Sequence, residues 1–335
     1  MNDTSKSRRS FVQHLVGVAA LGSLGGWRLP LRTDESLFKL SLAHWSYHKA
    51  IFGDSRRDYN WFIKTLHSDP DAVLLGPMDP RDIVVKAREH GLDAVDYANV
   101  LFFGHADDRP YLTELKRRAD GEGVKSLLIA CDELGRLGDA VPARRAQAVE
   151  NHVPWLEAAA FLNCDAIRAN AYGDGTYLEQ MHRTAEGLHE LCEQADAIGL
   201  DILLENHGES SNNGAWLAMV VESVNHPRLG LLADFGNWFM GGWNNDPPRW
   251  YDRYQGLRDI APYTRSVSAK SHKFDENGQE IETDFTEAMR LLLAGGFRGY
   301  VSVEYEGDGL TEDEGVAATK RLLEAVRETL TSELG

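Results

Sequence analysis

The sequence predicts a single (β/α)8 barrel over residues 38–332. Eight short apolar runs alternate with amphipathic stretches, which is typical of βαβ units around a parallel sheet. No linker or shift in composition divides the chain after residue 38. Eight such units in about 300 residues fit one closed barrel better than an open doubly wound sheet, and no G-x-G-x-x-G motif opens a helix.

The strands are expected where runs of aliphatic and β-branched residues end in polar ones: 38–45, 93–100, 125–132, 166–172, 201–207, 229–236, 266–272 and 300–306. Helices are expected from apolar residues at three- and four-residue spacing, over 81–90, 111–122, 144–162, 178–198, 285–293 and 312–334. Gly91, Gly199 and Gly296 each follow a helix and precede a strand, which suits a left-handed C-cap. Residues 52–78 are longer than a usual βα loop and predict a small accessory helix near the pocket.

The composition limits the class of partner. The formal net charge of −17 and the absence of Lys/Arg runs beyond the N-terminus argue against nucleic acid, because phosphate binding needs a concentrated basic surface. An acidic surface is ordinary for an enzyme of neutral sugars or small metabolites. A homo-oligomer is compatible with the sequence.

Residues 1–30 predict a twin-arginine export signal. Arg8 and Arg9 precede Phe11 and a mildly apolar, Gly/Ala-rich run, in the order of a charged region and a short hydrophobic region. The alternatives are a disordered basic tail or a first helix packed on the barrel. We therefore expect an exported, periplasmic protein that uses the twin-arginine machinery. Because no clean A-x-A cleavage site is visible, the signal could also stay as an anchor.

The three cysteines, Cys131, Cys164 and Cys192, form no C-x-x-C pair. Two lie in or beside expected strands and one in an expected helix. We predict buried free thiols and no cysteine metal site.

Three strands end in carboxylates: Glu205 in LLENHG, Asp234 in LLADFG and Glu304 in VSVEYEG. The C-terminal ends of barrel strands meet on one face, so these acids should converge on one pocket. They would repel one another unless a cation lies between them. Each acid alone could be a rim salt bridge, but three at one edge predict a divalent metal site, with His272 as the expected fourth ligand. Oxygen donors with one imidazole suit Mn²⁺, Mg²⁺, Co²⁺ or Zn²⁺.

The segments LLENHG, LLADFGNW, VSAKSHKFDENG and GYVSVEYEG resemble the xylose isomerase-like barrel superfamily, over about residues 38–330. This superfamily includes sugar isomerases, ketose 3-epimerases and endonuclease IV. The chain is most similar to its exported sugar phosphate isomerase/epimerase group. The resemblance implies that Glu205 and Glu304 bind metal and also move protons, with Asp234 as a further ligand. The family usually places its histidine ligand two residues before a lysine, and here Ser268 stands at that place, before Lys270.

Other residues near the strand ends suit a sugar. Substrate contacts are expected from five polar or aromatic side chains: Trp45, His48, Asn170, His207 and Asn237. His207 could equally hold a metal ligand in position by a hydrogen bond, without contacting the substrate. Lys270 is a further candidate catalytic residue. Arg168 shares a strand face with Asn170 and is expected to be a buried ion-pair partner.

These residues predict a metal-dependent sugar isomerase or epimerase that removes a proton next to a carbonyl of a sugar or keto-sugar. The same carbanion could eliminate a β leaving group, so a 3-keto-glycoside lyase or hydratase is the alternative. A non-catalytic sugar-binding protein is a second alternative. It is favoured by Ser268, because serine is a poor metal ligand and stands where the family usually has a histidine ligand. Phosphodiester cleavage is disfavoured, since the chain has few strand-end histidines and no basic groove.

Overall fold

The computed structural model describes residues 36–241 and 248–334. The expected export signal over residues 1–30 lies outside the described residues. Within the described ranges, no helix is both long enough and apolar enough to span a bilayer.

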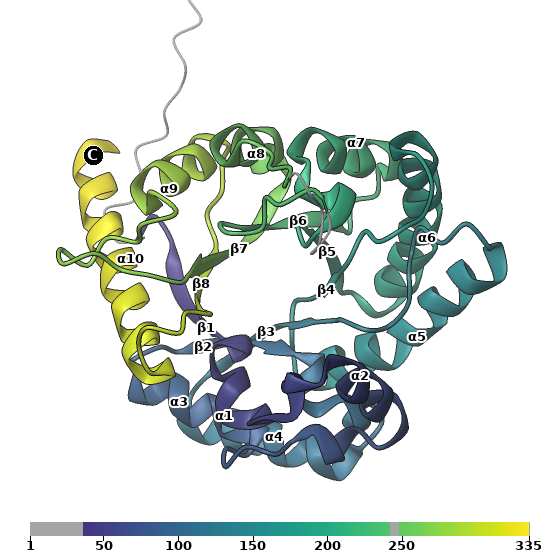
Figure 1. Cartoon of the computed structure of the whole chain (residues 1–335), viewed down its shortest axis with the longest axis horizontal. Helices are drawn as coiled ribbons and strands as arrows, with labels where there is room; N and C mark the ends of the chain where they lie inside the picture. The colour runs from purple at the N-terminus through teal and green to yellow at the C-terminus, as the bar shows by residue number, and fades with distance from the viewer. Residues whose placement is uncertain (1–35, 242–247, 335) are drawn as a thin grey trace, which may run out of the picture. The chain divides into compact units, whose positions relative to one another are not determined.

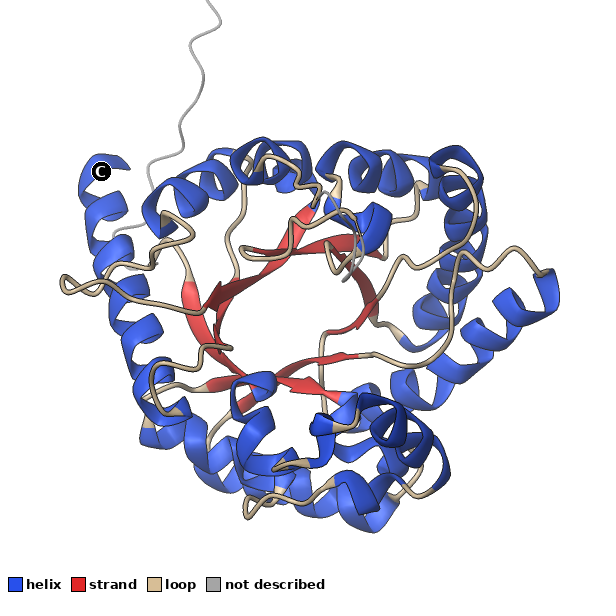
Figure 2. Ribbon diagram, viewed as in Figure 1, coloured by secondary structure: helices blue, strands red, loops and turns tan. Residues whose placement is uncertain are grey.

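Eight parallel strands form a closed barrel in which each strand pairs with the next and β1 pairs with β8. Figure 2 shows the strands as an inner ring with the helices outside it. The predicted fold class is confirmed. The strands are β1 (Lys39–Ala43), β2 (Ala94–Ala98), β3 (Lys125–Ala130), β4 (Ala166–Ala169), β5 (Asp201–Glu205), β6 (Leu229–Asp234), β7 (Thr264–Ser271) and β8 (Tyr300–Tyr305).

Helices follow the strands around the barrel (Figure 1). The ten α-helices of the described residues are α1 (His48–Phe52), α2 (Tyr59–Ser68), α3 (Ile83–Glu89), α4 (Arg109–Glu122), α5 (Pro142–Phe161), α6 (Tyr177–Ile198), α7 (Gly214–Val224), α8 (Arg253–Ile260), α9 (Phe285–Ala294) and α10 (Glu312–Leu334).

The expected accessory helix is confirmed as α2, which follows β1 and the short helix α1. Asp58 begins α2 by accepting a hydrogen bond from the backbone N–H of Trp61 at 3.0 Å. Helices α7 and α8 were not predicted. The first, GAWLAMVVESV, is apolar on most sides and so lacks the amphipathic pattern, while the second has only eight residues.

Side chains alternate between the two faces of each strand. The outward faces and the helices share one large core, which also buries the three free cysteines, as predicted. Inside the barrel, a small apolar cluster of Leu128, Ala166, Leu203 and Leu232 comes from β3 to β6. Residues two positions further along these strands also point inward, at the C-terminal face. The same alternation therefore forms an apolar floor and places polar residues above it.

Candidate active site

A pocket of about 1110 Å³ opens at the C-terminal face of the barrel. Its lining includes two of the three predicted carboxylates, Glu205 and Glu304. Asp234 is fully buried and does not line the pocket, although its Oδ2 is 3.7 Å from Nζ of the pocket-lining Lys270. Glu205, Asp234 and Glu304 end β5, β6 and β8, and all three are buried. Of the other predicted residues, Trp45, His207, Asn237, Lys270 and His272 line the pocket, as does Ser268.

Lys270 lies among three carboxylates. Its Nζ is 3.2 Å from Glu306, 3.3 Å from Glu304 and 3.7 Å from Asp234. The register pairs Lys270 with Glu304 on the neighbouring strand, so the alternation of both strands points these side chains the same way. The ammonium group therefore supplies a cation inside the acidic cluster.

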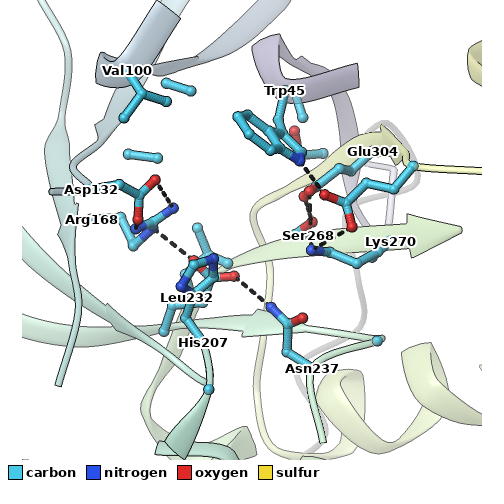
Figure 3. Close-up of a pocket in the computed structure, with 18 of the residues that line it drawn as sticks. Trp45, Val100, Asp132, Arg168, His207, Leu232, Asn237, Ser268, Lys270 and Glu304 are labelled. Atoms are coloured by element: carbon cyan, nitrogen blue, oxygen red, sulfur yellow. Dashed lines mark hydrogen bonds and ion pairs between the residues drawn. The ribbon is translucent and has the colours of Figure 1, made fainter. Parts of the chain in front are cut away.

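Arg168 on β4 provides a second cation, on a different wall of the pocket from Lys270 (Figure 3). Its Nε is 2.7 Å from Oε2 of Glu205, and its Nη1 is 2.7 Å from Oδ1 of Asp132. Asn170 donates to the same Asp132 oxygen at 2.7 Å. The predicted ion-pair role of Arg168 is confirmed. Asn170 is buried, bonds the pocket-lining Asp132 and does not itself line the pocket, so its role as a substrate contact stays a prediction.

Asp234 is held by the chain that follows it. Its Oδ1 accepts hydrogen bonds from the backbone N–H groups of Gly236, at 2.7 Å, and Asn237, at 2.9 Å. Its Oδ2 is buried and has no hydrogen-bond partner among the described residues. The Asn237 side chain donates to Oε1 of Glu205 at 3.3 Å, so this loop bridges two of the predicted ligands.

Ser268 donates a hydrogen bond to the Glu304 carboxylate. It therefore orients Glu304 from the position where the family usually has a histidine. His272, four residues further on, lies 3.6 Å from Glu282 and 3.7 Å from Glu306, at the side of the pocket. It also forms a group with Glu280 and Glu282. Its role as a fourth metal ligand stays a prediction.

Trp45 reaches the site through its indole N–H, which donates to the Glu306 carboxylate. His48 stacks on the Trp45 ring at 4.6 Å and bonds the Trp45 carbonyl through Nδ1 at 2.8 Å. His48 thus supports Trp45 from behind. His207 lines the pocket and bonds the hydroxyl of Tyr172 through Nδ1 at 2.8 Å. Both histidines stay predictions as substrate contacts.

Two residues that sequence reasoning did not single out belong to the site. Glu306 contacts Lys270, Trp45 and His272, and Asp132 contacts Arg168 and Asn170. Asp132 is the last residue of an expected strand. Glu306 stands two positions after Glu304. Each could have been found by the rule that located the other acids.

Burial and charge divide the carboxylates into two kinds. Burial raises the pKa of Glu205 to about 8, although the Arg168 guanidinium opposes the rise. Burial likewise raises the pKa of Glu304 to about 7, against the ammonium of Lys270. For Glu306, burial is outweighed by the Lys270 ammonium, the neighbouring His272 ring and a hydrogen bond from Trp45, and its pKa is well below the usual range. Burial therefore favours the protonated forms of Glu205 and Glu304 in the absence of a bound cation, whereas Glu306 stays ionised.

The donor set can be tested against a divalent ion. Glu205, Asp234 and Glu304 offer hard oxygen donors, and Oδ2 of Asp234 is a buried oxygen without a hydrogen-bond donor. Both features fit a bound cation. Because Lys270 contacts Asp234 and Glu304, its ammonium would share those carboxylates with the ion.

Residues 84–329 match the family model described as xylose isomerase-like TIM barrel. Two curated relatives are C-glycoside deglycosidase alpha subunits. That of Microbacterium trichothecenolyticum is 32% identical over 102 residues, covering 30% of this chain and 25% of the relative. That of Arthrobacter globiformis is 41% identical over 54 residues, covering 16% of this chain and 15% of the relative. The match thus spans a quarter or less of either relative's length.

Solved structures share the barrel. An L-ribulose 3-epimerase has a TM-score of 0.62 at 14% identity, over 89% of this chain and 97% of its own. The 3-keto-D-glucoside 4-epimerase of E. coli has a TM-score of 0.56 at 17% identity, over 74% and 95%. The zinc-bound IOLI protein has a TM-score of 0.59 at 17% identity, over 74% and 93%. At these identities the likeness is one of fold.

Proposed function

The chain belongs to the xylose isomerase-like TIM barrel family, and on that premise we propose that it is a sugar isomerase or epimerase acting on a sugar or keto-sugar. One observation carries the proposal: two buried carboxylates, Glu205 and Glu304, line one pocket from different strands, each beside a buried cation. Carboxylates placed on two sides of a bound substrate can remove a proton from it and return one.

In this reaction one carboxylate takes the proton from the carbon next to the carbonyl and the other returns a proton. Return to the opposite face of the same carbon gives epimerisation, and return to the neighbouring carbon gives isomerisation. Lys270 and Arg168 hold the two carboxylates in place, and Lys270 can donate a hydrogen bond to the substrate oxygen on which negative charge develops.

The proposal includes one divalent metal ion. Glu205, Asp234 and Glu304 would hold it, and once bound it would polarise the substrate's oxygens and stabilise the enediolate. Among relatives of the same fold, one is solved with zinc and another with magnesium. We leave the identity of the ion among Mn²⁺, Mg²⁺, Co²⁺ and Zn²⁺ to experiment.

A lyase or hydratase acting on 3-keto-glycosides is the second candidate. The partial match to proteins named C-glycoside deglycosidase alpha subunits favours it, since that name describes removal of the sugar from a C-glycoside. The same pocket would serve, because elimination begins with the same proton abstraction. The bond that breaks next would then be the one between the β carbon and the leaving group.

Incubation in D₂O with ketohexoses and 3-keto-glucosides, with each metal added, tests the proposal by NMR. We expect deuterium at the carbon next to the carbonyl. Recovery of a stereoisomer or a ketose–aldose pair identifies an isomerase or epimerase, and release of the aglycone identifies a lyase. Tight sugar binding without deuterium uptake in any sugar would instead indicate a binding protein.

We also propose export by the twin-arginine route, on the strength of the paired arginines in residues 1–30. Replacing Arg8 and Arg9 together by Lys should leave the precursor in the cytoplasm, because a receptor reads the arginine pair. Cell fractionation and immunoblotting measure this. Unchanged export of the double variant would refute the route.

A further inference from the structure

The pocket is larger than one sugar ring needs. Its volume of about 1110 Å³ exceeds the roughly 300–1,000 Å³ typical of pockets for drug-sized ligands. The ionic groups that the proposed chemistry uses lie around Lys270 and Arg168, at the ends of the strands. A monosaccharide bound among the ionic groups would therefore leave part of this volume unfilled.

Aromatic side chains from two loop segments also line the pocket. Tyr59 and Phe62 come from α2, which follows β1, and Phe239 and Trp250 come from the segment after β6. In the closed barrel these two strands are separated by β7 and β8, so the aromatics approach the pocket from different sides. Trp250 is 62% exposed and Tyr59 is 54% exposed. Both therefore have ring surface available to a ligand.

Trp250 is held in a defined place despite its exposure. A bridge pairs it with Phe239, and flanking backbone hydrogen bonds join Met240 to Arg249 at 2.6 Å and Tyr251 to Trp238 at 2.9 Å. Asn212 donates to the Phe239 carbonyl at 2.7 Å. The Phe239 and Trp250 rings lie 5.1 Å apart. One side of Trp250 thus packs on a fixed neighbour, which lowers the entropy lost when a ligand stacks on the ring.

We propose that Trp250 and Phe239 form a second subsite, which binds a ring attached to the sugar held among the ionic groups. The substrate class is then a glycoside whose aglycone offers a flat, apolar ring face. An aryl group and a second pyranose share that chemistry. This inference rests on the proposed function for the placement of the reacting sugar, and it narrows the substrate from free monosaccharides to glycosides.

Calorimetric titration with unreacted glucosides tests the subsite without requiring turnover. The probes are phenyl β-glucoside, cellobiose and methyl β-glucoside, which share the sugar and differ in the attached group. The wild-type protein should bind the phenyl compound or cellobiose about fivefold more tightly than the methyl compound, since a stacked ring contributes about 1 kcal/mol and about 1.4 kcal/mol corresponds to tenfold. The tighter of the two identifies the aglycone as aryl or sugar.

Trp250→Ala should remove this preference and leave the affinity for methyl β-glucoside unchanged, while Trp250→Phe should retain most of it. Trp61→Ala is the matched control, because Trp61 is an exposed tryptophan, at 42%, that does not line the pocket. Circular dichroism melts establish that each variant folds. Equal affinity of the wild type for the three glucosides, or an equal loss for all three in Trp250→Ala, would overturn the subsite. Failure of deuterium exchange would overturn the proposed function but leave this preference intact.

Discussion

Replacing Arg168 by methionine should destabilise the barrel more than any single surface ion pair could. Arg168 lies 2.7 Å from both Asp132 and Glu205, with all three side chains in or near the barrel interior. Methionine keeps much of the volume but leaves two carboxylates without their cation. Breaking a buried ion pair by removing one partner costs about 3–5 kcal/mol.

For a domain of about 300 residues, each kcal/mol lost lowers the melting temperature by about 1.6 °C, so we expect it to fall by roughly 5–8 °C. Urea unfolding followed by circular dichroism gives the free energy of unfolding, and calorimetry gives the melting temperature. Adding Asp132→Asn should recover about 1–3 kcal/mol, because it removes one of the orphaned charges. The double variant therefore tests whether the loss comes from uncompensated charge.

Arg290→Met is the control. Arg290 also contacts two carboxylates, Glu287 at 2.9 Å and Glu333 at 3.0 Å, but its side chain is 41% exposed. Its loss should cost less than about 1 kcal/mol. If Arg168→Met is no more harmful than Arg290→Met, or if Asp132→Asn worsens it, the charge-compensation argument is wrong.

Three further predictions concern the acids. Glu205→Gln and Glu304→Gln should each lower turnover by at least about a hundredfold, the usual scale for a positioned acid or base, and near wild-type rates of both would refute their role. Asp234→Ala should lose bound metal with the fold intact, so equal metal content by elemental analysis would remove Asp234 from the site. A further acid, Asp96, is a buried residue of β2 that lines the pocket. Burial raises its pKa to about 6, so its ionisation lowers the free energy of unfolding as the pH rises from the unfolded pKa near 4 to above 6. The free energy of unfolding of Asp96→Asn should therefore exceed that of the wild type by up to about 3 kcal/mol at pH 8 and by little at pH 4. A difference between the two proteins that does not change with pH would contradict this.

The order of elements and the acids at the strand ends could be predicted from the sequence, since both follow from local pattern. Strand periodicity places Glu205, Asp234 and Glu304 at one edge whatever the details of packing. The same periodicity put Arg168 on the inner face, where its pairing as a buried cation is confirmed. Helix α7 escaped prediction because an almost wholly apolar helix has no periodic signal.

The tertiary structure decided which charges meet. Sequence spacing places Lys270, Glu304 and Glu306 on neighbouring strands, but only the register of β7 against β8 brings the ammonium among the carboxylates. In the same way, the ring of His272 lies beside Glu282 and Glu306, which no spacing rule indicates. The physical reason is the distance along the chain. Hydrophobic periodicity is set within each residue's own strand or helix, whereas an ion pair depends on the relative placement of residues that are far apart in the sequence, as Lys49 and Asp308 are.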